Sequence, residues 1–301
     1  MGDRILDLSE RPFRLHVNNS LLVLESEGIN VPPIPLGDLA VVIASHPQIS
    51  FTQAVLSGLA TAGAAFVACD AKHRPVAMLL PLIAHSLQSE RFAAQAALSL
   101  PAKKQIWRRI IRAKIRAQGH VLQDTGNDDH GLLALSAKVR SGDSGNLEAT
   151  AAQTYWKRLF GSHKFRRNDE LDPCNSCLNY GYAVLRATVA RALCSSGLNP
   201  TLGVHHHNRY DPFCLADDLM EPFRPIVDRA VVRLMASRSD ALQLDSAAKQ
   251  HLLATLLGRF ESGGESRTLF DWLARSSASL ANIILGQQST LEIPELRHAS
   301  P

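Results

Sequence analysis

The spacing of apolar residues changes once, near Ser89, and this change constrains the fold of the 301-residue chain more than any other feature. Before Ser89, short apolar runs alternate with turn-forming residues such as the Asn-Asn and Pro-Pro pairs, which is typical of strands. After Ser89, apolar residues recur every three to four positions, which is typical of amphipathic helices. We therefore predict an α+β protein with a small β-rich part followed by a larger all-α part.

The limits of the two patterns predict the domains. We expect a β-rich domain over residues 1–88, an α-helical domain over residues 89–289, and an extended or disordered tail over residues 290–301, where Pro294 interrupts any helix. The predicted strands cover residues 4–8, 13–17, 21–25, 40–45, 65–69 and 76–80. A helix capped by Ser50 is predicted between the strands at 40–45 and 65–69. The predicted helices cover residues 90–99, 102–118, 132–140, 147–160, 178–195, 215–237, 247–260 and 268–285.

The distribution of charge is more informative than the net charge of +4. Between Arg91 and Gln123 the chain contains no acidic residue but seven basic ones: Lys103, Lys104, Arg108, Arg109, Arg112, Lys114 and Arg116. A second basic group follows: Lys157, Arg158, Lys164, Arg166 and Arg167. A solvated surface is the commonest role of a charged helix, but such surfaces usually mix signs. The missing counter-charge therefore favours phosphate binding and a nucleic-acid partner.

Cysteine usage and hydropathy bear on the compartment. Five scattered cysteines do not resemble a disulfide framework, so a reducing cytoplasm is expected. The first eleven residues carry charges where a signal peptide would be apolar. The most apolar stretch, residues 54–69, is interrupted by polar residues and glycines and is shorter than the roughly 20 residues that span a bilayer. No membrane role is predicted.

Glu148 is the first candidate for chemistry, because it follows the loop of residues 141–146 and lies just inside a predicted helix. Taken alone, it is most simply an acid that complements the helix dipole. The loop also contains Gly-Asp-Ser-Gly, which occurs in serine proteases. Asn146 replaces the glycine expected next, and a nucleophile is recognised by its partners, so Ser144 is interpreted as a loop residue.

A second group of candidates combines the histidine run at positions 205–207 with Asp218 and Glu221. The two acids are three residues apart, so they share one helix face. Imidazole with carboxylate is a ligand set for Mn²⁺, Mg²⁺ or Zn²⁺. An exposed histidine loop beside first-turn acids is the alternative interpretation. Cys174 and Cys177 have zinc-like spacing but no second ligand pair, which argues against a structural zinc.

Four ordered motifs resemble the CRISPR-associated integrases of the Cas1 family, especially the branch that accompanies the Cas9 effector, known as type II. They are residues 69–81, Glu148 with the Tyr-Trp-Lys-Arg-Leu-Phe-Gly run at 155–161, the Leu-Asn-Tyr-Gly-Tyr run at 178–182, and the Asp-Leu-Met-Glu-Pro-Phe-Arg-Pro run at 218–225. The resemblance covers nearly the whole chain. It implies the same division into a β-rich and a helical catalytic domain.

The family pattern implies that a glutamate, a histidine and a later acid bind a divalent metal ion. It selects Glu148, His206 and Glu221 as ligands and catalytic residues, although many relatives carry aspartate at the last position. Mn²⁺ or Mg²⁺ is expected because two ligands are hard oxygen donors. Asp218 is an auxiliary acid, and Asn175 matches a family asparagine, which makes Cys174 and Cys177 incidental. Arg108, Arg112 and Arg224 are weaker candidates for DNA backbone contacts.

The resemblance also implies the reaction and the partners. Short invader-derived duplexes with free 3′-hydroxyls are joined to the CRISPR repeat by transesterification, and endonuclease activity is the same chemistry with water or in reverse. The expected partners are double-stranded DNA (spacer precursor and repeat), a second copy of the chain in a homodimer, and a Cas2 dimer. A non-catalytic DNA-binding scaffold and a structure-specific metal nuclease outside adaptation are the alternatives. The complete set of three ligands disfavours the scaffold.

Overall fold

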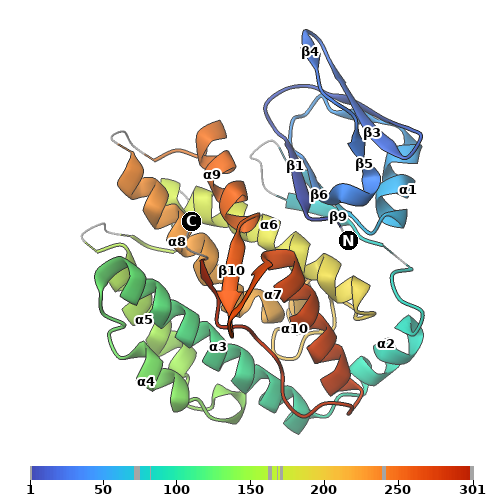
Figure 1. The fold of residues 1–301 in the computed structure, drawn as a ribbon. Helices are drawn as coiled ribbons and strands as arrows, with labels where there is room; N and C mark the ends of the chain where they lie inside the picture. Colours follow the sequence, from blue (N-terminus) through green and yellow to red (C-terminus); the bar gives the residue numbers. More distant parts are fainter. Residues whose placement is uncertain are drawn as a thin grey trace.

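A computed structural model describes residues 2–70, 75–81, 83–161, 165–167, 169, 172–238 and 242–298 of the chain. Strands dominate the N-terminal part and helices dominate the rest, so the predicted α+β class is confirmed (Figure 1). The motif at residues 69–81 and the basic residue Lys164 lie partly or wholly outside the described residues. The domain limits at residues 88 and 289 stay a prediction.

Two sheets form the N-terminal part. The first has the order β1-β6-β8-β9, with the first three strands parallel and β9 antiparallel: β1 (Arg4–Leu8), β6 (Leu39–Ala44), β8 (Ala65–Cys69) and β9 (Pro75–Leu79). The second contains β2 (Arg14–Asn18), β3 (Leu21–Ser26), β4 (Ile29–Asn30), β5 (Ile34–Pro35) and β7 (Ser50–Phe51). Helix α1 (Gln53–Thr61) begins after Thr52, whose side chain makes no capping hydrogen bond. The predicted cap at Ser50 is therefore wrong, because Ser50 belongs to β7.

Alternation along β6 explains how the first sheet joins the two parts of the molecule. Val41 and Ile43 pack into the large core that contains the helices, whereas Val42 and Ala44 pack into a smaller core with α1. Successive side chains of a strand point to opposite faces, so a run that is apolar throughout can serve two cores. The sheet is covered on both faces.

The described residues contain ten α-helices. Helix α1 belongs to the β-rich part, and the other nine follow it: α2 (Gln88–Ala96), α3 (Leu100–Gly126), α4 (Leu132–Ala137), α5 (Leu147–Leu159), α6 (Pro173–Ser195), α7 (Cys214–Met220), α8 (Arg224–Ser237), α9 (Ser246–Leu256) and α10 (Leu269–Ile284). The helix α3 is longer than predicted: Ser99 Oγ accepts a hydrogen bond from Ala102 N at its start, and Asn127 ends it in a left-handed conformation. Its predicted apolar side, with Ile106, Ile110 and Ile111, is buried.

The predicted helix over residues 215–237 is interrupted. It consists of α7, a 3₁₀ turn at Glu221–Phe223 and α8. Pro222 and Pro225 explain the break, since proline has no backbone N–H and restricts the residue before it. The motif that carries Glu221 is thus a corner between two helices.

Strands continue after residue 89, contrary to the sequence-based expectation. The predicted helix at 247–260 stops at Leu256 and a hairpin follows, made of β10 (Arg259–Ser262) and β11 (Glu265–Thr268). The two-residue strand β12 (Arg297–His298) pairs with β10, and Glu295 forms an ion pair with Arg116 of α3 at 2.6 Å. The C-terminal segment up to His298 is therefore extended and packed along the helical part.

Helices α6 and α8 approach closely at Gly181. A Cβ atom placed on Gly181 would lie 2.5 Å from Val227 Cγ1, which is too short for any side chain larger than hydrogen. The neighbouring Tyr182 consequently reaches Arg224 and Asp228 of α8.

Among the helices of the described residues, none is long and apolar enough to cross a membrane.

Candidate active site

Glu148 begins α5, but its carboxylate does not serve the helix start. The backbone N–H groups of Leu147 and Glu148 donate to the carboxylate of Asp143, at 3.0 and 2.9 Å. Asp143 therefore satisfies the free amides of the first turn. This arrangement leaves the Glu148 side chain available for a contact with α3.

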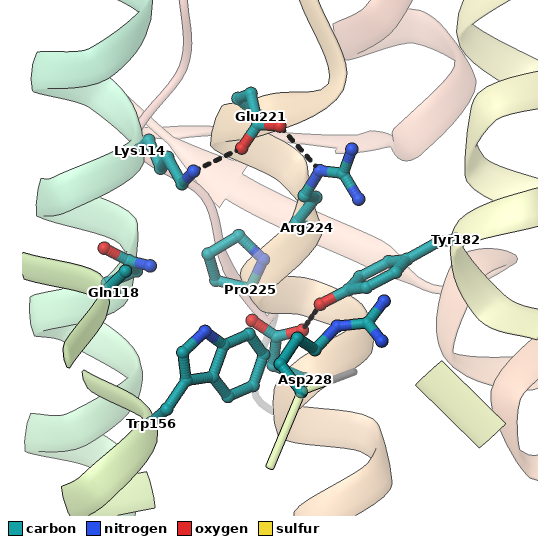
Figure 2. A pocket seen from close by; sticks show the side chains of 10 residues that line it. Lys114, Gln118, Trp156, Tyr182, Glu221, Arg224, Pro225 and Asp228 are labelled. Atoms are coloured by element: carbon teal, nitrogen blue, oxygen red, sulfur yellow. Dashed lines mark hydrogen bonds and ion pairs between the residues drawn. The ribbon is translucent and has the colours of Figure 1, made fainter. Parts of the chain in front are cut away.

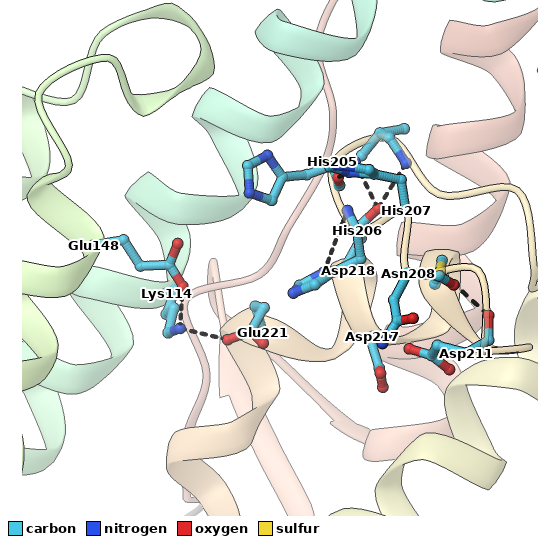
Figure 3. Close-up of polar contacts among 12 residues, drawn as sticks. Lys114, Glu148, His205, His206, His207, Asn208, Asp211, Asp217, Asp218 and Glu221 are labelled. Atoms are coloured by element: carbon cyan, nitrogen blue, oxygen red, sulfur yellow. Dashed lines mark hydrogen bonds and ion pairs between the residues drawn. The ribbon is translucent and has the colours of Figure 1, made fainter.

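Lys114 of α3 supplies that contact. Its Nζ lies 2.6 Å from Glu148 Oε1 and 2.5 Å from Glu221 Oε2 (Figure 3). The two proposed ligands from α5 and from the corner before α8 thus share one buried cation. The sequence analysis missed this role, because Lys114 was counted only as one member of a basic row. The pattern did contain a signal, since Lys114 follows the buried Ile110 and Ile111 by four and three residues and so lies on the apolar side of the helix.

Glu221 is buried and touches a second cation, with Arg224 Nε 2.9 Å from its Oε1. Burial alone would raise the pKa of Glu221, but the charges of Lys114 and Arg224 outweigh it and lower the pKa to about 2. The Lys114 contact is an ion pair without good hydrogen-bond geometry, so Glu221 Oε2 is a buried anionic oxygen that accepts no regular hydrogen bond. Such an oxygen is suited to a cation.

Asp218 fixes the histidine loop. Its fully buried carboxylate accepts hydrogen bonds from the backbone N–H groups of Val204, His205 and His206, and it lies 2.7 Å from His206 Nδ1. The hydrogen bond to Asp218 raises the pKa of His206. Because Nδ1 faces Asp218, the second ring nitrogen of His206 is left for another partner. An imidazole held by a carboxylate in this way is the usual arrangement around metal-ligating histidines.

The other two histidines have different surroundings. The ring of His205 stacks on Trp107, with ring centroids 4.0 Å apart, and burial lowers its pKa. The Nδ1 atom of His207 lies 2.7 Å from the backbone oxygen of its neighbour His205. These contacts of the three histidines are compatible with the family pattern, which selects His206 as the ligand.

The side chains of Glu148, His206 and Glu221 have the donor atoms that a divalent metal ion needs. In this structure the two carboxylates contact Lys114. Within the described part of the chain, no three His, Cys, Asp or Glu side chains converge in ligating positions. The Lys114 ammonium lies between the two carboxylates, where a cation is favourable. Two carboxylates and one oriented imidazole suit Mn²⁺ or Mg²⁺.

A cavity of about 150 Å³ adjoins Glu221 (Figure 2). Its walls combine cationic, aromatic and polar side chains, among them Lys114, Gln118, Trp156, Arg167, Tyr182 and Arg224. At its far end, Asp228 accepts hydrogen bonds from Tyr182 and, at 2.9 Å, from Tyr155. Burial raises the pKa of Asp228 to about 6, and the two tyrosine hydroxyls counter this only in part. Among the polar residues of this cavity, Gln118 and Asp228 were not identified from the sequence.

The cysteine pair lies away from any metal-like cluster. Cys174 and Cys177 are buried thiols in the first turns of α6, and burial raises the pKa of Cys177 to about 11. Asn175 between them has a role of its own: its Nδ2 donates to the backbone oxygens of Arg166 and Asp169. Its side-chain oxygen accepts a hydrogen bond from Arg167 at 3.0 Å, which orients a cation of the cavity wall.

The basic row on α3 is partly engaged by the protein itself. Arg108 Nε donates to the backbone oxygen of Val139, and Arg116 pairs with Glu295. Arg112 lies beside Arg108, Arg109 and Arg116, and partial burial together with these like charges lowers its pKa. A group of like positive charges around Arg112 is favourable for an anionic ligand.

Comparison with known proteins agrees with this fold. The family described as CRISPR associated protein Cas1 matches residues 8–253. The CRISPR-associated endonuclease Cas1 of Neisseria meningitidis serogroup C (strain 8013) is 41% identical over 245 residues, covering 81% of this chain and 80% of the relative.

Two solved structures have the same fold at lower sequence identity. A casposase bound to its integration product has a TM-score of 0.79 and 22% identity, covering 96% of this chain and 92% of the casposase. A Cas6-RT-Cas1–Cas2 complex has a TM-score of 0.73 and 21% identity over 95% of this chain and 35% of the chain compared. Fold and sequence thus define an α+β protein of the CRISPR-associated class. The chain belongs to the Cas1 family.

Proposed function

We propose that this protein is the metal-dependent DNA integrase of a CRISPR adaptation system, of the type II branch, with endonuclease activity at the same site. Glu148, His206 and Glu221 would bind Mn²⁺ or Mg²⁺ and are the catalytic residues. One observation carries this proposal: Glu148 and Glu221, from separate elements, share a single buried cation beside a histidine that Asp218 orients. The named relative is a CRISPR-associated endonuclease, which supports the reaction class.

The bound ion would lower the pKa of the attacking 3′-hydroxyl and neutralise charge on the phosphate. The protein's own groups prepare the site for this ion. Asp218 holds His206 in one orientation, and Arg224 holds one oxygen of Glu221 in place. Arg167 and Arg224 line the adjoining cavity, where their charges can bind phosphate oxygens of the DNA strand.

The partners follow from the family and the charge distribution. Double-stranded DNA, both spacer precursor and repeat, is the proposed substrate, and the cationic group around Arg112 on α3 is a candidate for backbone contacts. A homodimer and its association with a Cas2 dimer are further proposals, supported by a similar chain found in a complex with Cas2. Because the repeat array is chromosomal DNA, the cytoplasm of a bacterium is the proposed location.

Glu148→Ala tests the proposal directly. With Mn²⁺ present, the variant should lose detectable joining of a 3′-hydroxyl duplex to supercoiled repeat DNA, while duplex binding stays within a few-fold of the wild type. Glu90→Ala, at an exposed acid of α2, is the matched control and should join normally. Full joining by Glu148→Ala would overturn the assignment.

The same assay separates the two alternatives. A non-catalytic scaffold would bind DNA in a salt-sensitive way but neither join nor nick it with any divalent ion. A metal nuclease outside adaptation would cut or join target DNA equally well after the repeat sequence has been scrambled. Preference for the intact repeat supports the integrase.

A further inference from the structure

Lys114 is a buried lysine whose ammonium contacts two acids proposed to bind metal. Only 13% of its side chain is exposed, and Nζ lies within 2.6 Å of carboxylate oxygens of both Glu148 and Glu221. Charged lysines are rarely buried without such partners. Its position in the middle of α3 places the ammonium between α5 and the corner that precedes α8.

The charges of this cluster balance without a metal ion. Glu148 and Glu221 carry two negative charges, and Lys114 and Arg224 carry two positive ones. A divalent cation bound by the same carboxylates would add two positive charges within a few ångströms of the ammonium. Like charges at such distances in a partly dehydrated site repel strongly. Metal and ammonium therefore compete for the same oxygens.

The adjoining cavity gives the ammonium a place to move. Lys114 lines this cavity of about 150 Å³, which lies next to Glu221. The lysine side chain is a flexible four-carbon stem, so Nζ can leave the carboxylates without any movement of α3. In the cavity it would join Arg167 and Arg224, where a phosphate of bound DNA can offset the added charge.

We propose that Lys114 is an internal counter-cation, which holds Glu148 and Glu221 together in the metal-free protein and is displaced when the divalent ion binds. The inference rests on the proposed metal site and adds a determinant of its affinity. Without the competing ammonium, the same donors would bind the ion more tightly. The lysine thus keeps the empty site neutral at the expense of metal affinity.

Binding of Mn²⁺ to the DNA-free protein tests this proposal without any activity measurement. The paramagnetic resonance signal of unbound Mn²⁺ gives the dissociation constant. Lys114→Met keeps the length of the side chain and removes the charge, and it should bind Mn²⁺ about tenfold more tightly or better, as expected for about 1.4 kcal/mol. Lys138→Met, at an exposed lysine after α4, makes the same change in net charge and should match the wild type. Unchanged or weaker binding by Lys114→Met would overturn the inference.

Two ligand variants in the same assay distinguish this inference from the proposed function. Glu148→Ala and His206→Ala should weaken Mn²⁺ binding strongly. If both bind like the wild type, the proposed metal site itself is wrong. If both lose binding while Lys114→Met gains nothing, the metal site stands and only the counter-cation role fails.

A measurement on the wild-type protein guards against misfolding of Lys114→Met. Reductive methylation followed by mass spectrometry reports how accessible each lysine amine is. Lys114 should be protected in the metal-free protein and react several-fold faster with Mn²⁺ present, whereas exposed Lys138 should react equally in both states. Equal protection of Lys114 with and without Mn²⁺ would contradict its displacement.

Discussion

Two buried carboxylates, Glu221 and Asp228, stand seven positions apart near the start of α8, and their surroundings move their acidities in opposite directions. Both are at most 5% exposed. The charges of Lys114 and Arg224 lower the pKa of Glu221 to about 2 against the effect of burial. Burial raises the pKa of Asp228 to about 6, because its direct partners are the neutral hydroxyls of Tyr155 and Tyr182.

The comparison separates two uses of a buried acid. Ion pairs with cations keep Glu221 charged at every physiological pH, which a metal ligand requires. Hydroxyl donors satisfy the oxygens of Asp228 by hydrogen bonding and cross-link α5, α6 and α8, without any need for a full charge. Similar burial therefore keeps a charged acid at position 221 and supports packing at position 228.

Removing the charge of Glu221 should have the largest effect. Glu221→Gln leaves Arg224 buried without its acid, which typically costs about 3 kcal/mol of stability. Loss of the metal should lower the joining rate about 1,000-fold or more, since a bound ion supplies several kcal/mol of charge stabilisation. Urea unfolding in the presence of EDTA and the joining assay measure the two effects.

Glu90→Gln serves as the control for Glu221→Gln and should change neither quantity. A Glu221→Gln protein that joins DNA at the normal rate would show that charge on this acid is irrelevant. The contrast with Asp228 would then have no functional meaning.

The three neighbouring histidines should respond unequally. His206→Ala removes the imidazole that Asp218 orients, and joining should fall about 100-fold, within the range seen when groups around a metal are lost. His205→Ala loses its stacking on Trp107, which should lower stability by about 1 kcal/mol and joining only a few-fold. Joining rates and Mn²⁺ affinity of the three alanine variants, with His207→Ala as the mildest, provide the measurement. Equal losses at all three positions would show that the choice of His206 from the family pattern is wrong.

Asp228 should produce a smaller, pH-dependent effect. Its folded-state pKa of about 6 exceeds the value near 3.9 of an unfolded chain, so the native state binds more protons between these values. Its contribution to stability is fully present below about pH 4 and declines by up to about 3 kcal/mol as the pH rises to 6. Asp228→Asn resembles the protonated acid, so its stability relative to the wild type should rise over this range. Urea unfolding at several pH values tests this, and parallel pH profiles for both proteins would contradict it.

The sequence predicted the fold class because apolar spacing is a local property. Val41 and Ile43 in a strand and Ile106 and Ile110 in a helix repeat with the periods of their elements, and both pairs are buried as expected. The hairpin at residues 259–268 was missed because the apolar pattern of α9 runs directly into Phe260. The strands β10 and β11 have four residues each, and the further partner β12 lies far along the chain, so the pairing leaves little local signal.

The candidate site was predictable in part for a similar reason. The positions of the family motifs pointed to Glu148, His206 and Glu221. In the structure both Glu148 and His206 lie close to Glu221, and their role as ligands stays a prediction. Lys114 was missed, because its spacing from Ile110 places it on the apolar side of α3 but does not distinguish a lysine that pairs with acids from one whose stem reaches solvent. That distinction arises only when α5 and the corner before α8 pack against the helix.

The contact between Gly181 and Val227 has a consequence for how such a sequence can vary. A methyl group at position 181 would collide with Val227, and any increase there pushes α6 away from α8. Since Tyr182 and Asp228 are the next residues along these helices, the distance between them depends on the combined size of the pair at 181 and 227. Substitutions at the two positions should therefore be accepted only together, with growth at one matched by shrinkage at the other.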